Sequence, residues 1–475
     1  MARYVKTEQG YIDASIFAPA PFKPAGKSYL TFSSLSSFTL KVNDATKHWD
    51  GTLEYFASDK TWTVWDGTIT LSSVNNDGEY VLYLRGTGNT VITGNSENYR
   101  WVLTGSDIKC IGNIENLLDY ATVASGEHPA MANNCYSHMF KGCTALTQAP
   151  SLPATTLASY CYYCMFLGCT SLTQAPVLPA TTMASNCYNS MFNGCTGLIQ
   201  APALPATTLG ITCYYNMFSN CTALTQAPAL PATTLAEYCY SYMFEGCTGL
   251  IQAPALPATT LANSCYQRMF QNCSSLTQAP ALPATTLANY CYLGMFQGCT
   301  SLTQAPALPA MTLAESCYVA MFNGCKGLTK APELPATTLA SSCYFNMFSG
   351  CTSLKLSSTQ TGEYTQEYRI PSSGEGVTAT NVLKDMFTST GGTFTGTPEI
   401  NTTYYLSSDN MIVRETEIDT LNGYVDSMID VAIDKYADTA EYIVPSSTAG
   451  SIKKFKITVD DAGTLSATEV TDTTT

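Results

Sequence analysis

Cysteine and histidine are the side chains in this sequence whose spacing could hold a metal ion or perform redox chemistry. Cys161 and Cys164 form a CxxC pair, the spacing of dithiol redox centres and of many zinc sites. Cys135, His138 and Cys143 could supply three ligands to a zinc ion. Cys135, Cys143 and Cys161 belong to a pattern that recurs along the chain, whereas Cys164 and His138 occupy positions that vary from copy to copy. We therefore interpret both as coincidences and expect no metal site and no cofactor.

Familiar catalytic motifs do not occur in the sequence. It contains no GxxxxGK[ST] phosphate loop, no GxSxG nucleophile elbow, no HExxH zinc motif and no EF-hand loop. Three histidines leave little material for imidazole chemistry. Asp460 and Asp461 could form a paired-carboxylate site, but their place between two short apolar runs favours a hairpin turn. We therefore predict that the protein is not an enzyme.

The chain of 475 residues is acidic and moderately apolar. Lys and Arg total 22 and Asp and Glu total 36, so the formal net charge is −14. Hydrophobic residues make up 45% and charged residues 12%, a balance that excludes an intrinsically disordered chain. We expect no nucleic-acid partner, because binding to the phosphate backbone requires a basic face. No run of 18 apolar residues and no export signal is visible, so we expect no membrane span.

A strict repeat organises the middle of the chain. A Cys-Tyr pair recurs every 26 residues, and a Met-Phe pair and a second Cys follow it at fixed distances. Nine copies without an insertion predict a solenoid in which each copy is one coil, because one copy cannot bury its apolar face alone. The Cys of the pair lies at positions 135, 161, 187, 213, 239, 265, 291, 317 and 343.

The spacing inside a copy predicts one helix and one short strand per coil. Between Leu157 and Cys169, small and apolar residues follow the spacing of one helical face, opposite the variable positions. Leu172–Ala175 predicts a short strand that ends at Pro176, and stacking would place these strands in a parallel sheet. A Thr such as Thr182 is a candidate helix N-cap. The apolar positions are Ala158, Cys161, Tyr162, Met165, Phe166 and Cys169.

Eighteen of the twenty cysteines belong to the repeat, which places each sulfur at the same depth of every coil. A buried free Cys behaves as a small hydrophobe. A degenerate tenth unit, aligned on Met386 and Phe387, has Val382 where the other units have Cys, so the position needs filling rather than a thiol. We predict a reduced packing ladder and synthesis in a reducing cytoplasm; a disulfide framework is the alternative.

The repeat resembles the BspA-type leucine-rich repeats of bacterial surface proteins and of phages that infect gut Bacteroidales. The carrying pattern is MFxGCTSLTxAPxLPATTLAxxCY, as in the stretch that begins at Met295, and it covers about residues 130–354. The resemblance implies a curved or rod-like binding scaffold. The chain departs from the general leucine-rich consensus because a Pro interrupts the strand of each unit, so we expect a narrower sheet. The predicted fold class is an α/β solenoid of leucine-rich-repeat-like, 26-residue units, flanked by an N-terminal all-β domain and a C-terminal α+β oligomerisation module.

Aromatic side chains recur at the outward positions of the coils, among Asn, Ser and Gln. Residues 129–354 carry four basic and four acidic side chains, so this region is neutral. A face rich in Tyr, Asn and Ser resembles the chemistry of antibody paratopes, and Tyr rings also stack on the C–H faces of sugars. We predict a contact surface for glycan or protein; the alternative is a solvated face without a ligand. The candidate ligand-binding residues are Tyr160, Tyr163, Tyr215, Tyr238, Tyr242, Arg268, Tyr290 and Phe345.

The sequence before the repeat divides into two parts. Residues 1–26 predict an extended arm, either an attachment segment or a frayed terminus. Residues 27–128 contain alternating stretches such as Thr61–Trp65, separated by turn signals, and predict a β-sandwich-like domain. That domain would also cap the first coil of the solenoid at 129–354, because a solenoid end exposes apolar surface.

The sequence after the repeat carries most of the charge. Residues 355–475 hold 8 basic and 18 acidic side chains, so −10 of the −14 lies there. We expect a degenerate repeat or cap over 355–405, then a helix plus β-hairpin over 406–475. An apolar 3-4-3-4 spacing indicates a two-heptad helical seam that either packs on its own domain or is shared by about three chains. The candidate oligomerisation residues are Ile418, Leu421, Val425, Met428 and Ala432.

The last segment resembles the terminal module of phage head fibre proteins, which are oligomeric appendages on some tailed-phage capsids. The resemblance is carried by Ile443–Gly450 and by the following Ser451–Leu465, with a turn at Asp460 and Asp461. It implies an oligomer that is attached to a particle; with the helical seam, we expect a homo-oligomer and favour a trimer.

These patterns together predict a non-enzymatic phage virion appendage, a head fibre or a tail fibre-like protein, made in the host bacterial cytoplasm. We expect its partners to be a capsid or tail protein of the virion and a glycan or protein of the host surface or of mucin. A bacterial cell-surface leucine-rich repeat adhesin and a purely structural capsid decoration are the alternatives.

Overall fold

The computed structural model describes residues 4–7, 10–13, 22–26, 28–371, 381–413, 441–445, 452–459 and 465–470. The chain forms two compact units, Met1–Ile412 and Val413–Thr475. Strands dominate the regular secondary structure, and within the described residues α1 (Asn116–Ala124) is the one α-helix. None of the helices in these ranges has the length and hydropathy of a membrane span.

Two antiparallel sheets form the N-terminal part of the first unit. Their strands are ordered β10-β4-β7 and β11-β3-β9-β5-β6, with β8 paired to β9. The sheets pack through aromatic rings: the Trp101 ring lies 6.4 Å from that of Phe32 and 5.6 Å from that of Trp65. The strands are β3 (Leu30–Ser34), β4 (Thr39–Val42), β5 (Thr52–Phe56), β6 (Trp62–Trp65), β7 (Leu71–Ser72), β8 (Val74–Asn76), β9 (Glu79–Thr87), β10 (Trp101–Thr104) and β11 (Ile108–Ile111).

The sequence predicts a single extended arm over residues 1–26, but two of its segments pair with each other. β1 (Tyr4–Thr7) and β2 (Gly10–Asp13) pair as an antiparallel hairpin. Residues 14–21 of the predicted arm lie outside the described residues. Phe22 is buried against the rings of Phe56 and Tyr83, at 5.3 and 6.1 Å, so it belongs to the domain that follows.

The first repeat unit continues the core of the N-terminal domain. β11 pairs in parallel with β12 (Leu146–Gln148) of that unit. The Phe140 ring meets that of Trp101 edge to face at 6.2 Å, and the Cys143 thiol donates to the Trp101 carbonyl at 3.3 Å. The segments predicted as domains 27–128, 129–354 and 355–405 therefore share one compact unit and one continuous core.

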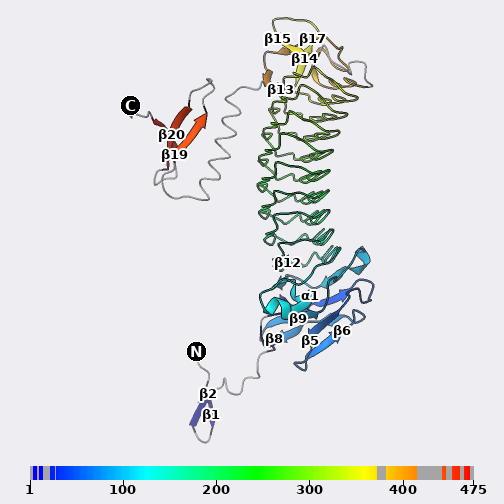
Figure 1. Ribbon diagram of the computed structural model, residues 1–475, viewed down its shortest axis with the longest axis vertical. Helices are drawn as coiled ribbons and strands as arrows, with labels where there is room; N and C mark the ends of the chain where they lie inside the picture. The colour runs from blue at the N-terminus through cyan, green and yellow to red at the C-terminus, as the bar shows by residue number, and fades with distance from the viewer. Residues whose placement is uncertain are drawn as a thin grey trace. The chain divides into compact units, whose positions relative to one another are not determined.

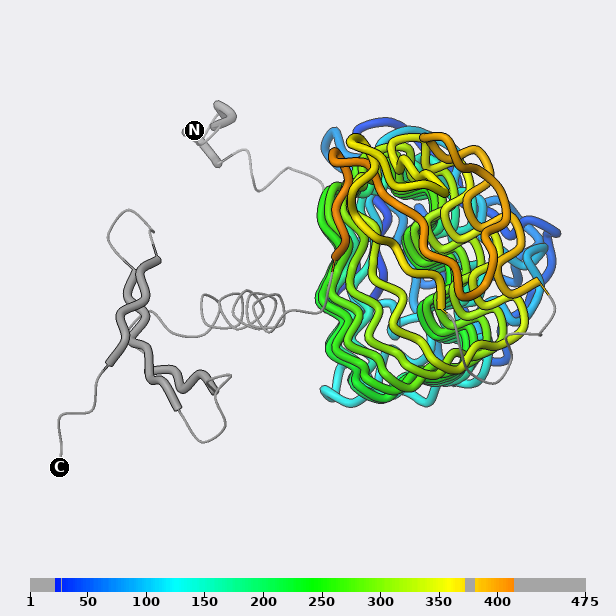
Figure 2. Tube along the Cα trace, turned by 90° about the horizontal axis from the view of Figure 1, so that it is seen from above, coloured from blue at the N-terminus to red at the C-terminus, as the bar shows by residue number. Residues whose placement is uncertain are grey.

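The repeat units stack as successive coils, which Figure 1 shows from the side and Figure 2 from the end. Backbone N–H groups alternate between two kinds of acceptor. Tyr162 N donates to Cys187 O in the next coil at 3.0 Å, whereas Tyr163 N donates to Tyr160 O within its own coil at 3.1 Å. Met165 N likewise donates to Tyr162 O at 3.1 Å. This alternation satisfies the buried backbone without a helix.

The prediction of a helix between Leu157 and Cys169 is wrong. Tyr160, Cys164 and Gly168 have φ values of 59°, 54° and 73°, and a left-handed residue at every fourth position excludes a right-handed helix. The inward pairs recur every 4 residues rather than every 3.6, so the same residues face the core in a ladder of turns. The α/β assignment of the coils is therefore wrong as well.

Isolated parallel bridges join the coils, where the sequence predicts short strands in a parallel sheet. Gln174 bridges Gln200, and the expected N-cap Thr182 bridges Thr208 instead of starting a helix. In the described part of the coils, strands proper occur only at the two ends, in β12 and β13 (Lys330–Pro332). A Pro two residues after each Gln lacks an N–H, which keeps this sheet narrow.

The interior of the coils consists of stacked columns of identical side chains. The Tyr162 and Tyr188 rings lie 5.8 Å apart, and those of Phe166 and Phe192 5.6 Å apart, in each case nearly parallel. All twenty cysteines are buried and unpaired, as the packing-ladder interpretation predicts.

A tenth coil and a small sheet close the far end of the stack. Tyr344 N donates to Val382 O at 3.0 Å, and the Phe387 ring stacks on that of Phe348 at 5.5 Å. Buried Asn410 bridges two coils by donating to the carbonyls of Thr329 and Ser353. The closing sheet has the order β15-β17-β14-β16. Its strands are β14 (Lys355–Ser357), β15 (Tyr364–Arg369), β16 (Gly391–Gly392) and β17 (Thr403–Ser407), and β18 (Met411–Val413) follows them.

The second unit contains an antiparallel sheet of order β19-β20-β21. Its strands are β19 (Glu441–Pro445), β20 (Ile452–Val459) and β21 (Leu465–Val470). Val459 pairs with Leu465 across the expected hairpin turn, whose residues 460–464 lie outside the described residues. The predicted helical seam also lies outside them; its residues are Ile418, Leu421, Val425, Met428 and Ala432.

Candidate binding surface

The predicted ligand-binding residues lie in the turns of the coils, at positions before or after the buried Cys-Tyr and Met-Phe pairs. Their side chains are exposed or half-buried. Tyr160, Tyr238 and Tyr290 are the most exposed, at 40%, 38% and 38% of their surface. All three have positive φ, between 55° and 60°. The remaining candidates are half-buried and contact neighbouring side chains; they are Tyr163, Tyr215, Tyr242, Arg268 and Phe345.

The first two coils carry an aromatic group next to the N-terminal domain. The Tyr163 ring meets those of Tyr160 and His138 edge to face, at 5.7 and 5.0 Å. Burial raises the pKa of Tyr163 to about 12 and lowers that of His138 to about 4, so both are neutral at physiological pH. The group therefore presents rings and neutral polar atoms rather than charge.

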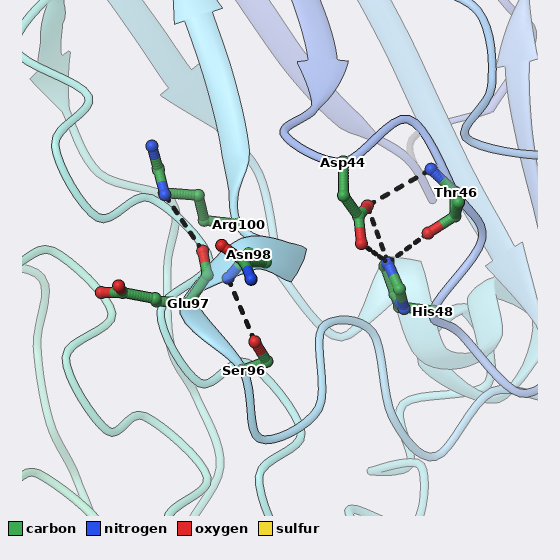
Figure 3. A network of polar contacts seen from close by, with 7 residues as sticks. All are labelled: Asp44, Thr46, His48, Ser96, Glu97, Asn98 and Arg100. Carbon is green, nitrogen blue, oxygen red and sulfur yellow. Dashed lines mark hydrogen bonds and ion pairs between the residues drawn. The ribbon is translucent and has the colours of Figure 1, made fainter.

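An ion pair joins this group to the N-terminal domain. Lys141 of the first coil pairs with Glu97, and the Lys141 ammonium lowers the pKa of that carboxyl. Glu97 belongs to the 3-10 turn η2 (Glu97–Tyr99), where Ser96 Oγ accepts a hydrogen bond from Asn98 N (Figure 3). Arg100 Nη1 donates to Glu97 O at 3.2 Å, which fixes the end of the turn.

His48 extends the polar group on the N-terminal domain. Its Nε2 lies 2.8 Å from both Asp44 carboxylate oxygens and 2.6 Å from Thr46 Oγ1 (Figure 3). The imidazole stacks on the Tyr99 ring with a centroid distance of 3.6 Å. Sequence reasoning missed His48 and Tyr99, because nothing in the local pattern relates residues that are 51 positions apart.

A second group spans the fourth to sixth coils, and we call Tyr215, Tyr242, Gln267 and Arg268 the Tyr242 cluster. The Tyr215 and Tyr242 rings lie 5.4 Å apart. Gln267 Nε2 and Arg268 Nη1 each donate to the Tyr242 hydroxyl at 3.3 Å. The Arg268 guanidinium also lies 5.6 Å from the centre of the Tyr242 ring. The structure thus joins three predicted residues and adds Gln267, which the sequence analysis did not single out.

Charge in this cluster is not balanced by an ion pair. Within the described residues, Arg268 lies within 4.0 Å of no carboxylate oxygen. Glu245 is near enough to interact with it electrostatically, but burial raises the pKa of this carboxyl. The Arg268 Nε atom is buried and has no hydrogen-bond partner.

The last two candidates belong to neither group. The Tyr290 hydroxyl donates to Glu315 Oε1 at 3.2 Å, and this bond raises the pKa of Tyr290. The Lys384 ammonium lies 5.9 Å from the Phe345 ring centre. The eight predicted residues therefore do not form one site: they divide into two clusters and separate aromatic contacts.

The cysteine arrangements do not have the properties of redox or metal sites. Burial raises the pKa of Cys164 to about 11 and that of Cys161 well above its ordinary value, so neither is a thiolate near neutral pH. Among the residues that the structure describes, no group of three or more His, Cys, Asp or Glu could hold a metal ion.

Comparison with protein-family models, with curated protein sequences and with solved structures finds no significant match. The resemblances to BspA-type repeats and to head fibre modules therefore rest on the sequence motifs.

Proposed function

We propose that the protein is a non-enzymatic phage virion appendage, a head fibre or tail fibre-like protein. Its coils form a solenoid of leucine-rich-repeat type and bind glycans or proteins of the host surface or of mucin. The observation that carries the proposal is the contrast between a constant backbone and an outward face of varied aromatic and polar side chains. A regular frame with variable side chains can match an extended ligand through many weak contacts.

The backbone conformation of this face argues for selection of its side chains. Tyr160, Tyr238, Tyr242 and Tyr290 all have φ between 55° and 60°, and Arg268 has 53°. A bulky residue in this region costs roughly 1–2 kcal/mol, whereas Gly and Asn adopt it readily. The backbone itself therefore does not favour Tyr or Arg at these positions, which supports a role of their side chains in binding.

The C-terminal region supports the proposed attachment and assembly. Residues 355–475 carry a net charge of −10, in contrast to the neutral coils, and Val413–Thr475 forms a compact unit of its own. We assign to this unit the contact with a capsid or tail protein and the assembly of a homo-oligomer, with a trimer favoured. Immunogold labelling of purified particles and of host cells separates a virion protein from a cell-surface adhesin.

Replacing the tyrosines tests the binding function. We expect the combined variant Tyr160→Asn, Tyr163→Ser, Tyr238→Asn and Tyr242→Asn to lose at least tenfold in adsorption to host cells or to immobilised mucin. Asn and Ser occupy the corresponding positions in other coils, so the fold is preserved.

A matched control carries four changes on other exposed positions. Val177→Ala, Ile199→Thr, Ile251→Thr and Met311→Thr each restore the residue of a neighbouring coil, and we expect adsorption to stay at the wild-type level. Adsorption by the tyrosine variant equal to that of the control would contradict the binding function and favour a structural decoration.

A further inference from the structure

We propose that the Tyr242 cluster is a subsite for the carboxylate of an acidic sugar, a uronate or a sialate. The inference rests on the proposed glycan-binding function and names the chemical class of the ligand. Arginine matches a carboxylate through two parallel N–H donors, and the half-buried aromatic rings of Tyr215 and Tyr242 beside it add apolar contact area for the sugar that carries the carboxylate.

Arg268 is held in place but is not neutralised. One terminal nitrogen donates to the Tyr242 hydroxyl, an uncharged acceptor, and the guanidinium lies against the Tyr242 ring. Its Nε is buried without a partner. A partly desolvated cation without a counter-ion is unfavourable, and a ligand carboxylate would supply the missing charge.

The next coil leaves space for this side chain. Gly294 occupies the position that corresponds to Arg268, with φ of 58°. A Cβ there would lie 3.0 Å from Arg268 Cγ and 3.6 Å from its Nε. Successive coils have Asn216, Tyr242, Arg268 and Gly294 at this position, so the guanidinium lies between an aromatic ring and a bare backbone.

Unpaired acceptors accompany the unpaired cation. Asn216 Oδ1 and Gln271 Oε1 are buried without hydrogen-bond partners. Gln271 N donates to Arg268 O, so this side chain belongs to the same turn as the guanidinium. Polar groups in and next to the cluster are therefore left without partners in the free protein, as the guanidinium is.

Between Lys141 and Lys326 the coils carry a single cationic side chain. Arg268 is the one Lys or Arg in the sequence from residue 142 to residue 325. Preference for an acidic ligand in this part of the coils must therefore depend on Arg268. Glu245 does not cancel the charge by pairing, since no ion pair forms between the two side chains.

Calorimetry on the full chain tests the inference with two matched ligand pairs: tetragalacturonic acid against its methyl ester, and 3′-sialyllactose against lactose. We expect at least one acidic member to bind tenfold or more tightly than its neutral counterpart. The pair that shows the preference identifies the source of the carboxylate.

Variants locate the preference at the guanidinium. We expect Arg268→Asn to abolish it, because Asn occupies the same position in two other coils and preserves the fold. Arg268→Lys should retain a reduced preference, because an ammonium cannot form the two parallel bonds. The exposed residue Lys326 is the control: Lys326→Gln should leave the preference unchanged.

Equal affinities of the wild type for acid and neutral ligand, no binding of either, or an unchanged preference in Arg268→Asn would each overturn the inference. Adsorption to host cells and mucin is measured in parallel. If adsorption persists without an acid preference, only the subsite is wrong; if wild-type adsorption is absent, the proposed function fails.

Discussion

The two cysteines of each repeat unit have different roles in the core. The Cys247 thiol donates to the Phe218 carbonyl of the preceding coil at 3.0 Å, and the corresponding bond recurs from coil to coil. Cys239 belongs to the other column, whose position Val382 fills in the tenth coil. The column of Cys239 fills space, whereas the column of Cys247 also bonds one coil to the preceding coil.

Matched substitutions distinguish the two columns. We expect Cys239→Val to change the free energy of unfolding by less than about 1.5 kcal/mol, because Val already fills this position in the tenth coil. Cys247→Val should cost more, about 2 kcal/mol, because it removes the S–H donor and adds a branch to a packed site. Urea midpoints measure the difference, and equal midpoints would show that the thiol bond contributes nothing.

His138 makes the stability of the first coil depend on pH. Burial, followed by the repulsion of Lys141, lowers the pKa of His138 to about 4 from an ordinary 6.5. Below pH 6.5 the unfolded chain binds a proton that the folded chain does not. The stabilisation present above pH 6.5 is therefore lost as the pH falls toward 4.

The variant His138→Asn tests this linkage. Its φ of 61° suits Asn, so the fold should be kept. We expect the urea midpoint of the wild type to fall more between pH 7 and pH 4.5 than that of the variant. Parallel pH curves for the two proteins would mean that His138 is charged or solvated in the folded state.

Each coil contains consecutive turns instead of a helix. A residue with left-handed backbone conformation at every fourth position sets the 4-residue spacing of these turns. The last left-handed position of each of the nine units is Gly or Asn, as in Gly324 and Asn272. A Cβ at Gly324 would meet the Gly298 backbone at 3.8 Å, an ordinary contact. A substitution there consequently tests the backbone conformation and not the available space.

The prediction at this scale compares two substitutions at one glycine. Gly324→Ala should lower the free energy of unfolding by about 1–2 kcal/mol, the cost of a left-handed non-glycine residue. Gly324→Asn should cost less, because Asn tolerates this backbone conformation and Asn272 occupies the equivalent position of another coil, also followed by a glycine in the next coil. The order of the two urea midpoints provides the check; a more stable Ala variant would be the behaviour of a helix.

At the scale of the first unit, each coil bonds to its neighbours and the two ends are closed by different structures. Trp101 of the N-terminal domain covers Phe140, and Tyr368 of the closing sheet meets Phe387 edge to face at 6.2 Å. The free energy of unfolding of such a stack is the sum of the intrinsic stability of each coil and the interface energy between neighbouring coils. Inner coils are therefore interchangeable, whereas the two ends are not.

Deletion of one whole unit, residues 185–210, should leave a folded protein. The fourth coil then meets the second with the same Tyr, Phe and Cys columns in register. We expect an unchanged shape of the far-UV circular dichroism spectrum and cooperative melting. Deletion of residues 185–208, two fewer, shifts the inward pairs by half of their 4-residue period and should give an unfolded or aggregated chain; cooperative melting of that variant would contradict the stacking of the coils.

The 26-residue spacing alone predicts the stack of coils, the residues that face inward and the buried, unpaired cysteines. A repeat without insertions places equivalent residues at equivalent depths, so these features follow from spacing alone. Over so short a segment the same inward residues fit a 3.6-residue period as well as a 4-residue period, so their spacing wrongly predicts a helix. The recurring Gly or Asn was the signal for left-handed turns.

Which outward side chains are in contact depends on how each coil packs on its neighbours. Tyr242 and Arg268 are 26 residues apart and lie in contact, whereas Tyr290 and Phe345 belong to neither cluster. The link from Lys141 to Glu97 likewise depends on how the N-terminal sheet docks on the first coil. Spacing fixes the position of a side chain on its coil, but its direction and partners depend on rotamers and on the space left by the adjacent coil. That space is set here by a single glycine, Gly294.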